Sequence, residues 1–223
     1  MKKTNLFNTP ERTRVLWHDL KTFPSAIHVY LDSILNGTYG KVPTQLTPIM
    51  QNLKAAAIKN ILTIENISIL HKIENDSLVT KSNKLLLDEL ASSALNFLLP
   101  LTLEDKKSVS LKINKGAALI SDTRYSSTIL QNMLVLALHF SAPGASITLT
   151  SEQGGIVIRS QTKATNQTIL DQTLAKHIYN PEQTAETLPA LIFYTTDYLA
   201  NKLGFIFKIL VEKNNLSIYY VKS

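Results

Sequence analysis

The 223-residue sequence contains no cysteine, which excludes disulfide bonds and thiolate metal sites and fits a reducing compartment. No apolar run approaches the roughly 18 to 20 residues that cross a bilayer, and the first residues lack the apolar core of a signal peptide. We therefore expect a cytoplasmic protein with no membrane association. Glycine is also scarce, with 7 in the chain and none between Gly155 and Gly204.

The charge of the chain is basic but diffuse. Lys and Arg number 23 against 17 Asp and Glu, which gives a net charge of +6. Aromatic residues make up only 7% of the sequence and do not interleave with a dense basic run, so we do not expect a nucleic-acid partner. A hydrophobic content of 44% is enough for a sizeable core in one large or two small domains.

Two long amphipathic segments occupy the first third of the chain. The first should form a helix over about residues 10–36, because Thr9 can cap its start and Gly37 can end it. The second should form a helix over about residues 44–75. Two long helices joined by a short loop form an antiparallel hairpin.

The first of these helices carries an apolar stripe with the spacing of a bundle seam. Its members are Leu16, Leu20, Phe23, Ile27, Leu31 and Ile34. One hairpin cannot cover both of its apolar sides, so we predict a homodimer in which two hairpins form a four-helix bundle.

A histidine lies opposite that stripe. At about 100° per residue, His18 falls about 180° from the stripe, beside Asp19 and on the same side as Lys21, Thr22 and Ser25. An imidazole on the wet face of a stiff helix has no packing role and is free to act as a nucleophile. A single exposed histidine on a helix is ordinarily just a surface residue, so His18, Asp19, Lys21 and Thr22 are at this point only candidate site residues.

The remainder of the chain alternates between strand and helix patterns. A helix after Asn83 should stop at Pro100, and Gly154-Gly155 and Asn214-Asn215 should turn hairpins. The expected strands are 77–80, 109–113, 118–121, 147–150, 156–160, 205–211 and 216–221, and the expected helices are 84–99, 123–140, 167–179 and 188–202. Helices on one side of a mixed or antiparallel sheet make an α+β fold with an α/β sandwich. We predict a helical-hairpin domain over residues 1–76 and a sandwich domain over residues 77–223.

The segment His18-Asp19-Leu20-Lys21-Thr22, followed by Pro24, resembles the phosphoacceptor motif of the sensor histidine kinases. That motif reads His, acid, apolar, Lys or Arg, Thr or Asn, then Pro. Here Phe23 intervenes before the proline, which shifts the expected bend of the helix by one residue. The order of a His-bearing hairpin and an α/β sandwich also resembles that family over essentially the whole chain.

A second stretch, residues 130–141, resembles the helix of the family that binds the magnesium ion of ATP. The family reads Asn-Leu-Leu-x-Asn-Ala-x-Lys-Phe or Tyr, and its second Asn is a magnesium ligand. In this sequence that position is Leu136, which offers no oxygen to a hard cation, and the Lys position is His139.

The remaining nucleotide motifs of the family are missing. An Asp-x-Gly-x-Gly turn should follow Arg159-Ser160, but residues 161–165 contain neither Asp nor Gly. A glycine-rich phosphate loop should precede the helix at 188–202, but residues 186–191 contain no glycine. We expect a kinase-like domain that does not bind ATP and that has no cofactor of its own.

The resemblance implies a histidine phosphotransferase of a bacterial phosphorelay. His18 would exchange a phosphoryl group with aspartates of response-regulator receiver domains, and the receiver would supply Mg2+. Asp19 would keep the attacking nitrogen basic, Thr22 would orient a water for dephosphorylation, and Lys21 would either offset phosphate charge or be a solvated lysine.

A pseudokinase is the alternative, in which the chain only binds receivers or a sensor histidine kinase and does no chemistry. The shifted proline favours this reading, whereas the retained His18, Asp19 and Thr22 favour the phosphotransferase. A kinase with unorthodox nucleotide binding is a third possibility.

Overall fold

A computed structural model describes residues 10–162 and 188–223 of the chain. The chain divides into two compact units, Met1–Asp76 and Ser77–Ser223. None of the helices in the described part of the chain has the length and apolar character needed to cross a membrane.

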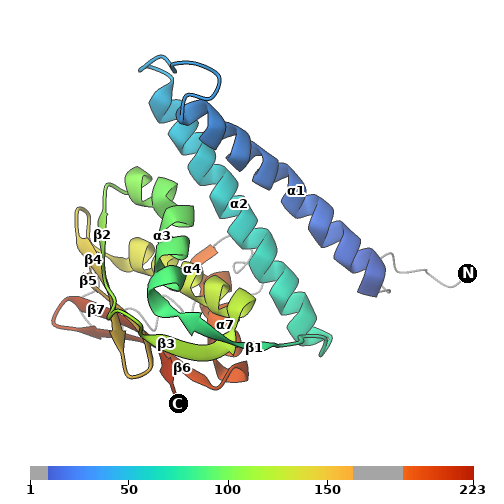
Figure 1. Cartoon of the computed structure of the whole chain (residues 1–223), viewed down its shortest axis with the longest axis vertical. Helices are drawn as coiled ribbons and strands as arrows, with labels where there is room; N and C mark the ends of the chain where they lie inside the picture. Colours follow the sequence, from blue (N-terminus) through green and yellow to red (C-terminus); the bar gives the residue numbers. More distant parts are fainter. Residues whose placement is uncertain (1–9, 163–187) are drawn as a thin grey trace, which may run out of the picture. The chain divides into compact units, whose positions relative to one another are not determined.

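The first unit is an antiparallel helical hairpin (Figure 1). Helix α1 spans Pro10–Leu35 and helix α2 spans Thr47–Glu74, which confirms both predicted helices. The turn after α1 uses Gly37 in a left-handed conformation with φ of +80°, which glycine adopts without steric cost. Helix α2 begins about three residues later than expected, because a turn closed by the Leu46 N–H and the Pro43 carbonyl precedes it.

Two ion pairs fix the register of the hairpin. Lys21 of α1 donates to Glu65 of α2 at 2.6 Å, and Lys54 of α2 donates to Asp32 of α1. Lys21 and Asp32 lie eleven residues apart (32 − 21), as do Glu65 and Lys54 (65 − 54), so the two helices run antiparallel without a slip in register. The Trp17 and His71 rings, with centroids 6.2 Å apart, add a further contact between the two helices nearer the start of α1.

The face of α1 that packs on α2 includes Leu31 of the predicted apolar stripe but not the most exposed members of that stripe. Buried Pro24 and Leu31 and the partly buried residues Trp17, Lys21 and His28 share the α2-facing side at helical spacing. The stripe residues Leu16, Leu20, Phe23 and Ile27 are exposed by 36%, 43%, 74% and 51%, respectively, within this single chain. At about 100° per residue, they lie about 90° around the helix from the α2-facing side.

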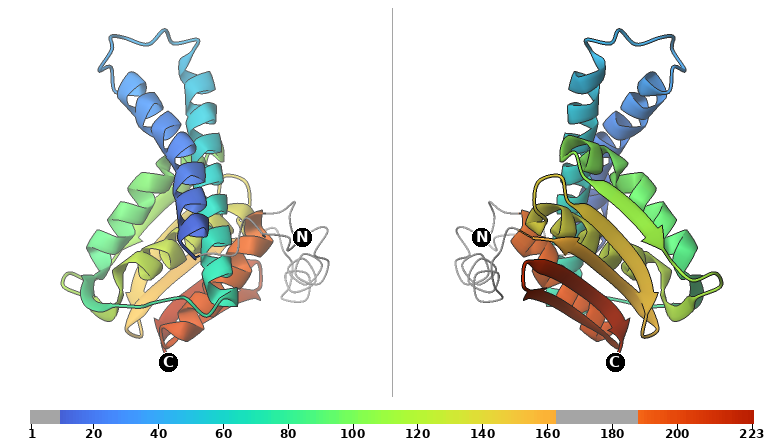
Figure 2. Two further views of the ribbon diagram at one scale, coloured as in Figure 1. Left: turned by 90° about the vertical axis from the view of Figure 1, so that its right-hand side faces the viewer. Right: turned by 90° about the vertical axis from the view of Figure 1, so that its left-hand side faces the viewer.

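The second unit contains a five-stranded mixed sheet, a two-stranded sheet and three described helices. The five-stranded sheet has the order β2-β4-β5-β7-β6, with only the β2–β4 pair parallel, and β1 pairs antiparallel with β3. Helices α3, α4 and α7 lie on one face of the five-stranded sheet (Figure 2). The elements are β1 (Ser82–Leu86), α3 (Leu87–Glu104), β2 (Ser108–Lys112), β3 (Ala118–Asp122), α4 (Thr123–Phe140), β4 (Ser146–Glu152), β5 (Gly155–Gln161), α7 (Leu188–Lys202), β6 (Phe205–Glu212) and β7 (Asn215–Lys222). This arrangement confirms the predicted α+β fold with an α/β sandwich.

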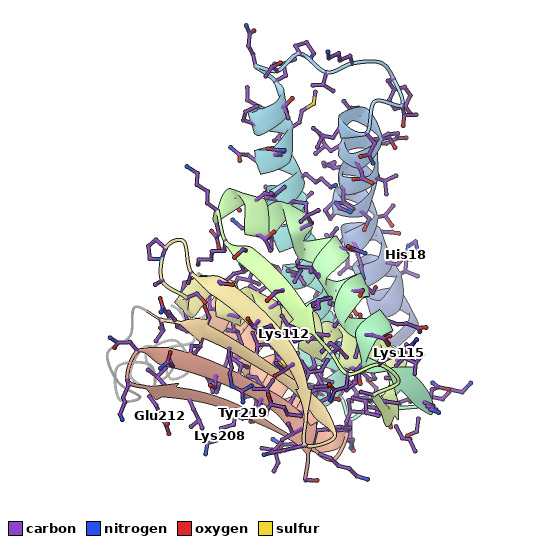
Figure 3. The ribbon with its side chains drawn as sticks, turned by 60° about the vertical axis from the view of Figure 1, so that its left-hand side comes forward. His18, Lys112, Lys115, Lys208, Glu212 and Tyr219 are labelled. Atoms are coloured by element: carbon purple, nitrogen blue, oxygen red, sulfur yellow. The ribbon has the colours of Figure 1, made fainter. Side chains whose placement is uncertain are left out.

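The opposite face of the five-stranded sheet is polar. Lys112, Tyr219 and Lys208 carry side chains on it from β2, β7 and β6 (Figure 3). Glu152 accepts hydrogen bonds from both terminal nitrogens of Arg159 on the neighbouring strand. These hydrogen bonds lower the pKa of Glu152 to about 2.

Most predicted elements of this unit are confirmed, because their signals are local. The helix predicted at 123–140 has those bounds, with the Asp122 side chain accepting from the Tyr125 N–H as its N-terminal cap. Both predicted hairpins are present as β4–β5 and β6–β7. The helix expected at 167–179 lies outside the described residues.

Three predictions near the start of this unit are wrong. No strand forms at 77–80, and the segment from Ser82 to Leu86 is strand β1 rather than the start of a helix. Pairing of β1 with β3 places Leu85 opposite Leu119 and overrides the local helical pattern. Pro100 lies inside α3 rather than ending it, because it is buried at the packed side of a helix that other contacts hold.

Candidate functional site

The predicted nucleophile lies on the surface of α1. The His18 side chain is 79% exposed, and Figure 3 shows it on that helix. An open groove beside α1 is lined by His18, Lys21, Thr22, Ser25, Val29 and Tyr30. The structure therefore presents the imidazole to solvent, where a partner can reach it.

Asp19 contacts the ring of the neighbouring histidine. The distance between His18 Nδ1 and Asp19 Oδ1 is 3.3 Å, and the Asp19 side chain is 64% exposed. A carboxylate at Nδ1 favours the tautomer in which Nδ1 carries the proton. The lone pair of Nε2 is then available for attack on an electrophile.

Lys21 is not a freely solvated lysine. Its ammonium donates to Glu65 on α2 at 2.6 Å, and the Glu65 side chain is only 12% exposed. Lys21 is three residues after His18 and so lies on a neighbouring part of the helix surface. The structure thus adds Glu65 to the surroundings of the site.

Thr22 lies one turn after His18. Its hydroxyl donates to the His18 backbone carbonyl at 2.8 Å, which is the usual local bond of a helical threonine. The hydroxyl oxygen keeps its lone pairs, so Thr22 can still accept a hydrogen bond from a water in the groove.

The proline of the motif is inside α1. Pro24 has no N–H to donate to the Leu20 carbonyl, which weakens the helix just after the histidine. Its ring is buried on the α2-facing side, whereas the inserted Phe23 is exposed by 74%.

The middle of the helix that corresponds to the nucleotide-binding helix of the family is buried on all sides. Leu136 is 0% exposed, and every residue from Asn132 to Leu138 is buried. Seven consecutive buried residues occupy almost two turns of α4, so the middle of this helix exposes no side chain. His139, at the lysine position of the family motif, is exposed near the end of the helix.

Asn132 occupies the first asparagine position of that motif and has a structural role. Its amide nitrogen donates to the Thr196 hydroxyl at 3.0 Å and links α4 to α7. Both residues are fully buried, so this bond satisfies polar groups that would otherwise be costly to bury.

The end of β5, where the family has its Asp-x-Gly-x-Gly turn, is tied to the end of α4. The Thr162 hydroxyl donates to the Phe140 carbonyl at 2.7 Å, and Ala142 N–H donates to the Gln161 carbonyl at 2.9 Å. Residues 163–165 and 186–187 of the missing motifs lie outside the described residues. Within residues 10–162 and 188–223, no group of three His, Asp or Glu side chains is placed to hold a metal ion.

Solved structures resemble this chain over most of its length. The cytoplasmic segment of histidine kinase QseC matches 73% of this chain and 95% of its own, with a TM-score of 0.53 and 12% identity. Acinetobacter baumannii histidine kinase AdeS matches 90% of this chain and 95% of its own, with a TM-score of 0.53 and 14% identity. Full-length ShkA in complex with AMPPNP matches 96% of this chain and 47% of its own, with a TM-score of 0.54 and 13% identity.

The chain has the histidine kinase fold. No protein-family model matches the sequence, and no curated protein matches it either. At 12 to 14% identity the similarity establishes the fold only.

Sequence reasoning missed Glu65 because the partner of Lys21 is 44 residues away. The signal that could have found it is the antiparallel register: once the turn is placed near residue 43, charges at equal distances from it face each other. Asn132 lies within the motif of the magnesium-binding helix. Its structural role was missed because its contact with Thr196 joins two helices and has no local sequence signal.

Proposed function

We propose that this protein is a histidine phosphotransferase of a two-component phosphorelay, with His18 as the phosphoryl acceptor. The observation that carries the proposal is a solvent-exposed imidazole, supported at Nδ1 by Asp19, on a histidine kinase fold whose magnesium position is the buried Leu136. Relative to the family motifs, the sequence retains His18 and Asp19 of the phosphoacceptor motif but has Leu136 in place of the magnesium-binding asparagine.

The reaction needs little from this chain. The Nε2 lone pair of His18 forms a bond to phosphorus while the bond between phosphorus and the receiver's aspartyl oxygen breaks, and the carboxylate leaves with the electron pair. Asp19 stabilises the positive charge that develops on the ring. The receiver domain is the partner expected to bring Mg2+, so no metal site is required on α1.

ATP is not expected to bind. A fully buried leucine at position 136 has neither an oxygen for Mg2+ nor access to a nucleotide. The described residues therefore do not fit the nucleotide of an active kinase, and phosphoryl groups must reach His18 from another protein.

The chain is proposed to act as a homodimer. In a four-helix bundle each helix packs against two neighbours on sides about 90° apart. Helix α1 has two such sides: one packs on α2, and the other is the exposed stripe of Leu16, Leu20, Phe23 and Ile27. Helix α2 carries exposed apolar residues at helical spacing, Ile49 and Leu53, and Leu46 just before its start is exposed as well.

The transfer experiment uses purified receiver domains phosphorylated on aspartate. We expect wild-type protein to gain phosphate and His18→Gln to gain none while keeping its oligomeric state, because an exposed side chain leaves no cavity when it is replaced. Asp19→Asn should slow transfer by about 10- to 100-fold without abolishing it. Thr22→Ala should leave transfer nearly unchanged and reduce only the loss of phosphate to water.

A pseudokinase is the second candidate, and the inserted Phe23 is the observation that favours it. The bulky exposed ring of Phe23 between Thr22 and Pro24 changes the surface next to His18 that a receiver domain would contact, and this change could prevent phosphoryl transfer. Receivers that bind wild-type protein and His18→Gln equally, with no label on either, would support this second candidate.

A further inference from the structure

Lys21 lies between two possible anionic partners. On the helical wheel it falls about 60° from His18 and about 40° from the middle of the α2-facing side, at about 100° per residue. It now donates to Glu65 at 2.6 Å, and together with His18 it lines the groove beside α1. The flexible side chain of Lys21 lets its ammonium reach toward either Glu65 or a group on His18.

Phosphorylation of His18 changes the charges around this lysine. A phosphoryl group brings about 1.5 to 2 negative charges at neutral pH and three acceptor oxygens. It would lie on a residue three positions from Lys21, which is the spacing of neighbouring side chains on a helix. The Glu65 carboxylate carries a single charge and is itself largely buried.

We propose that Glu65 is a positioning residue that competes with phospho-His18 for the ammonium of Lys21 and so sets how readily His18 gives up its phosphoryl group. With Lys21 held by Glu65, the phosphoryl group lacks a neutralising cation, and the equilibrium with the receiver aspartate favours return of the phosphoryl group. If Lys21 is released from Glu65, it stabilises phospho-His18. This inference rests on the proposed function, because it assigns the control of the same site.

Because of this competition, substitutions of Glu65 and of Lys21 should shift the phosphoryl equilibrium in opposite directions. Glu65→Gln should free Lys21 and shift the equilibrium between phospho-receiver and phospho-His18 toward His18 by about two- to five-fold, the range of an exposed charge pair. Lys21→Met should shift it toward the receiver by a similar factor. Lys21→Arg should shift the equilibrium less than Lys21→Met, because it keeps the positive charge.

A second ion pair of the same hairpin supplies the matched control. Asp32 and Lys54 join the same two helices in the same register, but Asp32 is 14 residues from His18, or about 21 Å along the helix. That distance exceeds the Debye length of about 8 Å at physiological salt. Asp32→Asn and Lys54→Met should therefore change the stability of the hairpin without changing the phosphoryl equilibrium.

The experiment measures the equilibrium ratio of phosphorylated receiver to phospho-His18 for wild type and each variant. A parallel measurement phosphorylates the histidines chemically with phosphoramidate and follows the loss of phosphate from His18 by site-resolved mass spectrometry. Opposite shifts for Glu65→Gln and Lys21→Met, with both controls unchanged, are expected. Equal shifts in one direction would show that the pair only holds the helices together, and would overturn the inference.

The two measurements separate this inference from the proposed function. If wild-type His18 takes no phosphate from any receiver, the phosphotransferase proposal fails. The lifetime of chemically phosphorylated His18 still tests the competition, because Glu65→Gln should lengthen it and Lys21→Met should shorten it. Unchanged lifetimes in both variants would overturn the inference alone.

Discussion

Two histidines on α1 lie in opposite surroundings. The His18 side chain is exposed, whereas His28 is half-buried near Lys54 and Asp32. Burial, followed by the positive charge of Lys54, lowers the pKa of His28, and Asp32 only partly offsets this. The lowered pKa favours the neutral form of His28 in the hairpin, whereas the exposed His18 is the proposed phosphoryl acceptor.

This difference predicts a pH dependence of stability. Because the folded chain has a lower pKa at His28 than the unfolded chain, the unfolded chain binds the proton more readily, and stability is lost as pH falls from about 6.5 through the folded pKa. Urea unfolding at pH 7.5 and 5.5 should show this loss in wild type. His28→Gln should flatten the difference, whereas His18→Gln should leave it in place; an equal pH dependence in wild type and His28→Gln would refute the assignment.

Leu136 provides a test of the nucleotide argument. Leu136→Asn would restore the family's magnesium ligand, but in a fully buried position it should destabilise the protein by about 2 to 5 kcal/mol, through lost packing and an unpaired amide. Leu136→Met, of similar volume, should cost less than about 1.5 kcal/mol. Thermal unfolding of the wild type and of Leu136→Asn is measured with and without MgATP. A rise in Tm with MgATP in either of these two proteins would contradict the account.

At the scale of helices and strands, sequence patterns predicted the elements whose position depends on interactions between residues close in sequence. Helix 123–140 was predictable because its cap and its apolar spacing are both local. The β1–α3 boundary was not, because pairing of Leu85 with Leu119 joins segments 34 residues apart (119 − 85) and overrides local propensity. Periodicity located the apolar stripe of α1, whose role as a bundle seam stays a prediction. It did not locate the face that packs on α2, which includes Lys21 and its distant partner Glu65.

The exposed stripe of α1 predicts where the proposed dimer would form. Ile27 and Val29 are 51% and 59% exposed and only two residues apart, but only Ile27 lies in the stripe. Ile27→Glu should weaken dimerisation at least about 100-fold, because a buried aliphatic side chain contributes about 1.5 to 3 kcal/mol in each of two copies. Val29→Glu should leave the dimer intact.

Light scattering over a concentration series distinguishes the outcomes. A wild-type monomer at micromolar concentration would remove the bundle proposal. Equal weakening by both substitutions would place the interface elsewhere on the helix.

At the scale of the whole molecule, one unit carries His18, the proposed phosphoryl acceptor, and the other has the kinase-like sandwich with Leu136 at the magnesium position of the family motif. The fold is that of histidine kinases such as QseC and AdeS. Exposed His18 and buried Leu136 together lead to the central claim, which is that phosphate reaches this protein from an aspartate and not from ATP.

The most direct test compares two sources of labelled phosphate side by side. Wild-type protein and His18→Gln are incubated either with labelled MgATP alone or with labelled phospho-receiver domains, and acid-labile, alkali-stable phosphate is located by mass spectrometry. The account predicts label on His18 of the wild type from phospho-receivers only, and none on the variant. Label on His18 from MgATP alone would show an unorthodox kinase and contradict the central claim.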